Sequence, residues 1–127
     1  MPIFYVGAGS ALGGLFRYWF DLGLISYASM NAYLVLALIN LLGSFLIGWI
    51  LVYTKGVSQR WHFWGLGFCG GFTTYASFSY LLYDGILNLD PKLICAYAIG
   101  MIFGGMFLFI LGVFSAKKWL IRASAKA

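Results

Sequence analysis

The chain has 127 residues, of which 63% are hydrophobic, while only eight are Lys or Arg and three are Asp or Glu. This composition excludes a soluble globular protein and is typical of an integral membrane protein, for which we expect no nucleic-acid partner. The length accommodates about four spans of roughly 20 residues and leaves no room for a soluble domain.

Four apolar stretches separated by short polar segments predict an all-α membrane protein with four transmembrane helices. The spans are expected at about residues 3–25, 33–53, 61–87 and 93–115. Pro91 lies just before the fourth span, where proline suits the start of a helix. The whole chain, residues 1–127, is interpreted as a single four-helix domain.

The first span contains two opposite charges, Arg17 and Asp21, placed four residues apart. Side chains at this spacing can meet on one face of a helix. Near a membrane interface such a pair serves as a structural anchor, or Arg17 contacts an ion directly. Both interpretations stay open.

Glycines recur at four-residue spacing in three of the spans, which predicts close contacts between helices rather than ligand sites. The pairs are Gly9 and Gly13, Gly67 and Gly71, and Gly100 and Gly104.

The second span contains an amide, Asn40, several residues from either end. A polar side chain at this depth needs a partner, and an interhelical hydrogen bond is one interpretation. The other is that its NH₂ group donates to a passing anion, which a carboxylate could not do.

The third span is expected to be broken near its middle. Gly70, Gly71, Thr73 and Thr74 can unwind a helix so that carbonyl groups point inward as cation ligands. Tyr75 and Phe78 follow three residues apart on one helix face, and the positive edges of their rings can face a small anion. Alternatively, both rings simply pack against lipid or a partner helix.

The basic residues gather on one side of the predicted membrane. Lys92 lies between the third and fourth spans, whereas the second and fourth spans are followed by Lys55, Arg60, Lys117, Lys118, Arg122 and Lys126. By the positive-inside rule both termini face the cytoplasm, as expected for a multi-pass protein of a bacterial-type plasma (inner) membrane. Membrane lipid with anionic headgroups is a compatible partner for the basic tail.

Acid–base chemistry has little support. The chain contains no Glu and a single His, and its three Asp lie near span ends. A proton-coupled carrier usually needs a carboxylate at membrane depth, and enzymes need positioned acids, bases or nucleophiles. The sequence therefore predicts a protein that is not an enzyme.

Three segments resemble motifs of the Fluc/CrcB family of fluoride channels, and the likeness covers almost the whole chain. Gly67-Phe-Cys-Gly-Gly-Phe-Thr-Thr-Tyr-Ala-Ser-Phe-Ser79 is similar to the family's helix-break motif. Ile39-Asn-Leu-Leu-Gly-Ser-Phe-Leu-Ile-Gly48 is similar to its second-span motif, and Gly7-Ala-Gly-Ser-Ala-Leu-Gly-Gly-Leu-Phe-Arg17 to its first-span run.

The resemblance implies an antiparallel, dual-topology-type dimer with two fluoride pores and a structural sodium ion at its centre. Backbone carbonyls of Gly70 and Thr73 would bind the sodium ion. The implied pore residues are Asn40, Thr74, Tyr75, Ser77, Phe78 and Tyr97, and Arg17 would match the family's first-span arginine near the pore vestibule.

Several positions depart from the family pattern. Tyr75 replaces the first of two phenylalanines, Ala76 replaces a serine and Leu81 stands where glutamate is common. The fourth span has Met101, Gly105 and Phe109 where hydroxyl residues are usual. Because the charge bias is also strong for a chain that must insert in both orientations, we expect a related second subunit, with a homodimer as the alternative.

Two other classes of protein stay in view. A small multidrug-type transporter shares the size and the four spans but would be expected to use a membrane-embedded glutamate. A non-conducting subunit that supports a channel partner is the second alternative.

Overall fold

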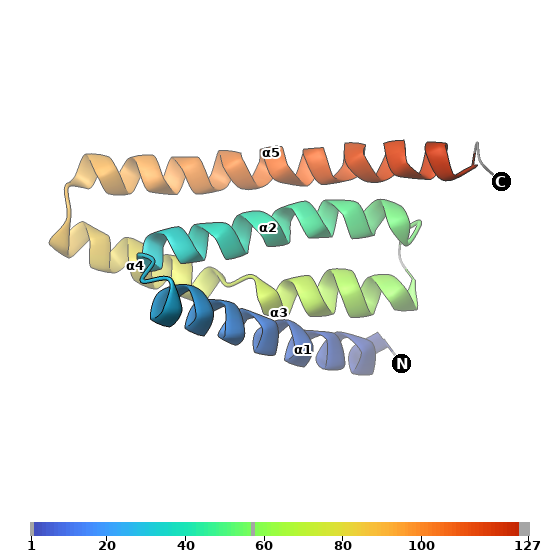
Figure 1. Ribbon diagram of the computed structural model, residues 1–127, viewed down its shortest axis with the longest axis horizontal. Helices are drawn as coiled ribbons and strands as arrows, with labels where there is room; N and C mark the ends of the chain where they lie inside the picture. The colour runs from blue at the N-terminus through green and yellow to red at the C-terminus, as the bar shows by residue number, and fades with distance from the viewer. Residues whose placement is uncertain (1, 57, 125–127) are drawn as a thin grey trace.

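The computed structural model describes residues 2–56 and 58–124, and this part of the chain folds into four helical segments without strands. The first is α1 (Pro2–Leu22), continued by the wider π turn η1 (Gly23–Tyr27), and the second is α2 (Ala32–Tyr53). The third comprises η2 (Trp61–Cys69), α3 (Gly70–Phe72) and α4 (Tyr75–Asn88), and the fourth is α5 (Pro91–Ser124). The predicted all-α class with four helices is confirmed (Figure 1).

Side chains and special backbone conformations set several helix ends. The N-cap Asn31 accepts from the Tyr33 N–H at 2.8 Å, and Asp90 accepts from the Lys92 N–H at 2.8 Å at the start of α5. After α2, Lys55 and Gly56 have φ values of 54° and 92°. Left-handed backbone of this kind ends a helix and is least costly at glycine.

Close glycine contacts join the helices in two pairs, α2 with α5 and α1 with η2 and α3. A Cβ atom at Gly9 or Gly13 would collide with the backbone of Phe63 or Phe68. The predicted contacts at Gly9, Gly13, Gly67 and Gly71 are therefore confirmed. Within the single chain no such contact occurs at Gly100, where nothing lies within 4 Å of the Cβ position, whereas a Cβ at Gly104 would lie 3.2 Å from the Leu41 side chain of α2.

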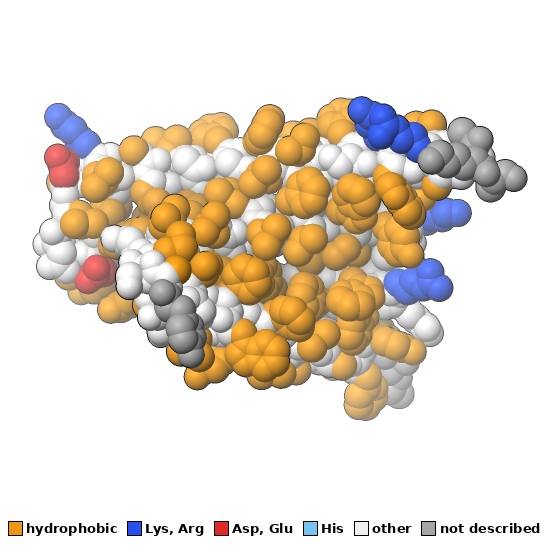
Figure 2. Space-filling view, viewed as in Figure 1, with side chains coloured by type: hydrophobic (Ala, Val, Ile, Leu, Met, Phe, Trp, Pro, Cys, Tyr) orange, Lys and Arg blue, Asp and Glu red, His pale blue; other side chains and the backbone are white. Residues whose placement is uncertain are grey.

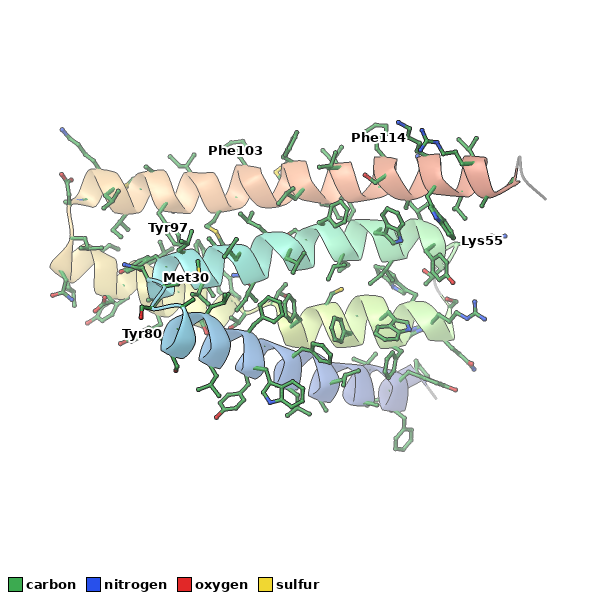
Figure 3. All side chains as sticks on the ribbon, viewed as in Figure 1. Met30, Lys55, Tyr80, Tyr97, Phe103 and Phe114 are labelled. Carbon is green, nitrogen blue, oxygen red and sulfur yellow. The ribbon has the colours of Figure 1, made fainter. Side chains whose placement is uncertain are left out.

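Large apolar side chains cover much of the outer surface, while the fully buried core is small. The core cluster comprises Val35, Ile39 and Phe72. Phe103 and Phe114 of α5 point outward and are 66% and 64% exposed (Figure 3). Among the described residues, α2 and α5 are long and apolar enough to cross a membrane, which agrees with a membrane environment for this surface.

Charges separate to the two ends of the molecule (Figure 2). Most basic side chains in this view lie at the end of the molecule where α5 ends and α2 connects to η2, with Lys55 at this end in Figure 3. Lys92, in the first turn of α5, is an exception at the opposite end. The acidic side chains visible in this view lie at the opposite end. Lys126, counted above with the basic tail, lies outside the described residues.

Candidate functional site

Two residues between α3 and α4, Thr73 and Thr74, have extended backbone. Their φ and ψ angles are −79° and 158° for Thr73 and −145° and 117° for Thr74. Gly70 and Gly71, which the sequence suggested would unwind, instead belong to α3. A Cβ at Gly71 would collide with the backbone of Ser10 on α1, so the absence of a side chain here allows the two helices to approach.

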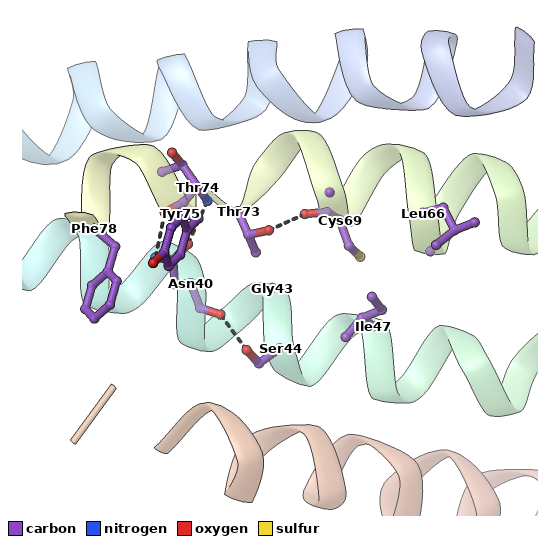
Figure 4. Close-up of a pocket in the computed structure, with 12 residues that line it drawn as sticks. Asn40, Gly43, Ser44, Ile47, Leu66, Cys69, Thr73, Thr74, Tyr75 and Phe78 are labelled. Atoms are coloured by element: carbon purple, nitrogen blue, oxygen red, sulfur yellow. Dashed lines mark hydrogen bonds between the residues drawn. The ribbon is translucent and has the colours of Figure 1, made fainter. Parts of the chain in front are cut away.

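Asn40 of α2 pairs with the backbone of Thr74 at this point (Figure 4). The Thr74 N–H donates to Asn40 Oδ1 at 2.9 Å, and Asn40 Nδ2 donates to the Thr74 carbonyl at 3.3 Å. One amide thus serves both polar groups of an extended residue, as buried backbone requires. The interhelical hydrogen bond predicted for Asn40 is present, and its NH₂ group has a second hydrogen to donate.

At this break in the helix, the carbonyl groups of Gly70 and Thr73 lose the N–H donors that a continuous helix would give them. In a continuous helix the N–H of Thr74 would reach the Gly70 carbonyl, and that of Ser77 would reach Thr73. The Thr74 N–H donates to Asn40, and the Ser77 N–H donates to Thr74 Oγ1 at 3.2 Å. Gly70 is exposed and lines the cavity, with open space where a side chain would lie.

An open cavity of about 420 Å³ lies against these groups on one face of the molecule. It is formed by residues of α2, η2, α3, α4 and the extended pair. The lining comprises Asn40, Gly43, Ser44, Ile47, Gly65, Leu66, Cys69, Gly70, Thr73, Thr74, Tyr75 and Phe78 (Figure 4). Six of the predicted site residues therefore lie together: Asn40, Gly70, Thr73, Thr74, Tyr75 and Phe78.

Aromatic rings continue from this cavity toward α5. Tyr75 is 81% exposed, and its ring centroid lies 6.3 Å from that of Phe78. Phe78 in turn lies 6.1 Å from Tyr97. Tyr97 is thus one ring removed from the cavity, and its hydroxyl donates to the Tyr33 carbonyl at 3.0 Å.

Two predicted site residues lie elsewhere. Ser77 accepts from the Thr74 hydroxyl at 3.2 Å and lines a separate hollow that it shares with Asp21 and Tyr80. Arg17 is on α1, which contributes no described residue to the cavity lining.

Sequence reasoning missed Gly43 and Ser44, which line the cavity three and four residues after Asn40. The Ser44 hydroxyl donates to the Asn40 carbonyl at 2.9 Å. A Cβ at Gly105 of α5 would lie 3.4 Å from Ser44 Oγ. Helical periodicity from Asn40 was the signal that could have identified both residues.

The cavity chemistry suits ions that bind to neutral groups. Its lining contains amide and hydroxyl donors and aromatic rings but no carboxylate or basic side chain. No group of three or more His, Cys, Asp or Glu residues that could hold a metal ion occurs in the described part of the chain. A cation held here would need carbonyl oxygens, which are hard ligands suited to ions without a preference for nitrogen or sulfur.

Comparisons with known proteins agree on one family. Residues 4–113 match the family described as CrcB-like protein, Camphor Resistance (CrcB). The protein named Fluoride-specific ion channel FluC from Prosthecochloris aestuarii is 38% identical over 125 residues, which cover 92% of this chain and 94% of that protein. The protein of the same name from Gloeobacter violaceus is 33% identical over 116 residues, covering 88% and 93%.

Proposed function

Because the chain belongs to the CrcB family of membrane proteins, whose matched relatives are named fluoride-specific ion channels, we propose that it forms a passive fluoride channel. Fluoride moves down its electrochemical gradient and leaves the cytoplasm without coupling to an energy source. One observation carries the proposal. Asn40, which is hydrogen-bonded to the Thr74 backbone, and Phe78 both line an open cavity whose described lining contains no carboxylate.

Fluoride is strongly hydrated, so a channel must replace its water with donors that do not trap it. The second N–H of Asn40 supplies such a donor at the cavity. The Thr74 hydroxyl donates to Ser77, so the hydroxyl hydrogen left to donate is that of Ser77, in the neighbouring hollow. The ring edges of Tyr75 and Phe78 carry partial positive charge and accompany the ion through an apolar section, and Tyr97 packs against Phe78. No fixed positive charge is required at the constriction.

The open cavity supports assembly with a second subunit. Tyr75 is 81% exposed beside it, so a second subunit that covers this face would enclose the ring at the cavity. We assign the partner an antiparallel orientation, so that the cavities of two subunits face each other. The carbonyls of Gly70 and Thr73, deprived of their helical donors, would hold a structural sodium ion together with the same groups of the partner. The ion supplies a positive charge that joins the two subunits.

In the membrane, α1, α2, η2 with α3 and α4, and α5 form four spans. The basic end of the molecule faces the cytoplasm of a bacterial-type cell, which places both termini inside. Arg17 lies on the half-buried surface of α1, where it anchors this helix or lines a vestibule.

A related subunit of opposite charge bias is the favoured partner. The fourth helix has Met101, Gly105 and Phe109 where hydroxyl groups are usual, so two copies of this chain would leave part of each pore without donors. A non-conducting supporting role is the second candidate function, and it rests on the same missing hydroxyl groups. A multidrug-type transporter is disfavoured because the cavity lining has no carboxylate to exchange a proton.

Ion flux from liposomes tests the function directly. The purified chain is reconstituted alone and fluoride efflux is recorded with an ion-selective electrode, with chloride efflux as the control. Fluoride-selective efflux establishes a working homodimer and contradicts the obligate partner. A silent but folded preparation is then reconstituted with a related subunit of opposite charge bias, and silence again favours the supporting role.

The sodium site has its own test. Exhaustive exchange of sodium for a large organic cation is expected to lower flux and the dimeric fraction together, and sodium should restore both. Full flux after exchange, in a preparation shown to be sodium-free, would contradict the proposed ion.

A further inference from the structure

Two tyrosines outside the cavity, Tyr33 of α2 and Tyr97 of α5, connect three helices through hydrogen bonds. The Tyr33 hydroxyl donates to the Leu81 carbonyl of α4 at 3.0 Å and lies 3.4 Å from Asp84 Oδ2. The Tyr97 hydroxyl donates to the Tyr33 carbonyl at 3.0 Å. Their rings meet edge to face, with centroids 5.4 Å apart and an interplanar angle of 84°.

These bonds matter because α4 is otherwise held by little buried surface. It has 14 residues, of which only Gly85 is buried. A Cβ at Gly85 would collide with the Ile94 side chain of α5 and would lie 3.0 Å from the Tyr33 hydroxyl, so glycine leaves room for both side chains to approach α4. Asp84 is held from its other side by Asn88, whose Nδ2 donates to Oδ1 at 2.9 Å. Tyr33 is thus a principal tie between α2 and α4.

The position of α4 determines where Phe78 lies. Phe78 is on the first turn of α4, and its ring contacts that of Tyr97 at a centroid distance of 6.1 Å. Tyr97 therefore packs against the ring of Phe78. Tyr33 holds α4, which carries Phe78, through its hydroxyl, and its backbone carbonyl accepts from the Tyr97 hydroxyl.

A tyrosine hydroxyl has one hydrogen to donate. In this structure the Tyr97 hydroxyl donates its hydrogen to the backbone carbonyl of Tyr33. Tyr97 is consequently suited to act through its ring and not as a hydroxyl donor to an ion.

We propose that Tyr33 and Tyr97 form a hydrogen-bonded brace that positions the edge of Phe78 at the cavity. They are positioning residues and do not bind fluoride through their hydroxyl groups. The inference rests on the proposed channel function and assigns a role to Tyr33, which neither composition nor spacing singled out.

A double-mutant cycle in fluoride efflux tests the brace. Tyr33→Phe removes the tie to α4 but keeps the ring and its backbone carbonyl, and Tyr97→Phe removes the hydrogen bond to that carbonyl. Each change is expected to lower the efflux rate about 3- to 10-fold, the equivalent of one net hydrogen bond. The double variant should lose less than the product of the two single losses, because both belong to one unit. Tyr83→Phe, at an exposed tyrosine on α4, is the matched control and should conduct like the parent chain.

The dependence of efflux on fluoride concentration separates positioning from ion binding. If the two tyrosines form a brace, both variants should have a lower maximal efflux rate than the parent. Their dimeric fraction should be unchanged, and their half-saturating fluoride concentration should stay within about twofold of the parent value. If Tyr97→Phe alone loses flux, with a raised half-saturating concentration and an unaffected Tyr33→Phe variant, Tyr97 is an ion ligand and the inference is overturned. A parent chain that stays silent in folded dimers, alone and with a partner, would instead overturn the channel function and the brace with it.

Discussion

Asn40 is the residue on which the site depends most directly, because its amide group bonds to both backbone groups of Thr74. Without it, one N–H and one carbonyl would lose their partners at membrane depth. Each such group costs about 1–3 kcal/mol. A structural role and a role in ion binding therefore coincide in one side chain, and a substitution must be chosen to separate them.

We expect Asn40→Asp to abolish fluoride efflux while the protein remains dimeric. The carboxylate is nearly identical in shape and still accepts from the Thr74 N–H, but it cannot donate and its charge repels an anion. Repulsion of the anion and loss of the donor are expected to lower the efflux rate about 100-fold, the equivalent of roughly 3 kcal/mol in the barrier to permeation. Efflux from liposomes and size-exclusion chromatography measure the two properties.

The control is Asn31→Asp, because Asp caps a helix as well as Asn does and the α2 N-cap should be preserved. Asn40→Asp channels that conduct at half the parent rate or more would remove this amide from the ion path.

We expect Phe78→Ile to reduce fluoride efflux about tenfold or more, the rate equivalent of about 1.4 kcal/mol. Isoleucine keeps the apolar character of the site but has no positive ring edge. Phe103→Ile is the matched control, since Phe103 lies on the outward face of α5 and is 66% exposed (Figure 3). Equal flux from the two variants would show that the ring of Phe78 does not contact the ion.

At the scale of the elements, contacts of glycine with backbone decide how closely the helices approach. We expect Gly13→Ala to destabilise the protein by about 1–3 kcal/mol, because its Cβ would collide with the carbonyl of Phe68. Gly14→Ala should be neutral or slightly stabilising, since nothing lies within 4 Å of that position and alanine favours a helix. Thermal unfolding in detergent compares the two, and equal melting temperatures would contradict the close contact.

The helices themselves were largely predictable, because long apolar runs separated by polar residues are the strongest signal in such a chain. The second helix was expected at 33–53 and is Ala32–Tyr53. The fourth was expected to end near residue 115, yet α5 continues to Ser124. Lys117 and Lys118 end a hydrophobic span but not a helix, since both side chains can extend into water while the backbone stays helical.

The fine structure of the third segment was less predictable. Glycine suggested unwinding at Gly70 and Gly71, but these residues remain helical where Gly71 packs on α1. The extended backbone falls at Thr73 and Thr74. Tyr33 was not predicted at all, because its importance comes from hydrogen bonds to Leu81 and Tyr97, which are distant in sequence. Local patterns identify residue types, whereas such partnerships depend on packing.

For the whole molecule, the separation of charge predicts a single orientation in the membrane. A fluorescent-protein fusion to the C-terminus should fluoresce, and an alkaline phosphatase fusion at the same place should be inactive, because the first folds in the cytoplasm and the second is active only outside it. The expected signal ratio exceeds about tenfold, in line with the strength of the basic bias.

Replacing Lys117, Lys118 and Arg122 with serine should reduce this ratio. Comparable signals from both fusions to the unaltered chain would indicate insertion in both orientations. That result would favour an antiparallel homodimer over a related partner subunit.

The hydrogen bonds between Asn40 and Thr74 also bear on biogenesis. Both backbone groups of Thr74 are paired within one chain, and no buried side-chain nitrogen or oxygen among the described residues lacks a partner. A newly synthesised subunit can therefore remain in the bilayer before it meets another, because its interrupted helix exposes few unpaired groups to lipid. Two subunits of opposite orientation can then be inserted by separate ribosomes and pair afterwards by lateral diffusion. Delayed expression of the second subunit should still rescue the first from degradation, and pulse-chase labelling would measure how long the single subunit survives.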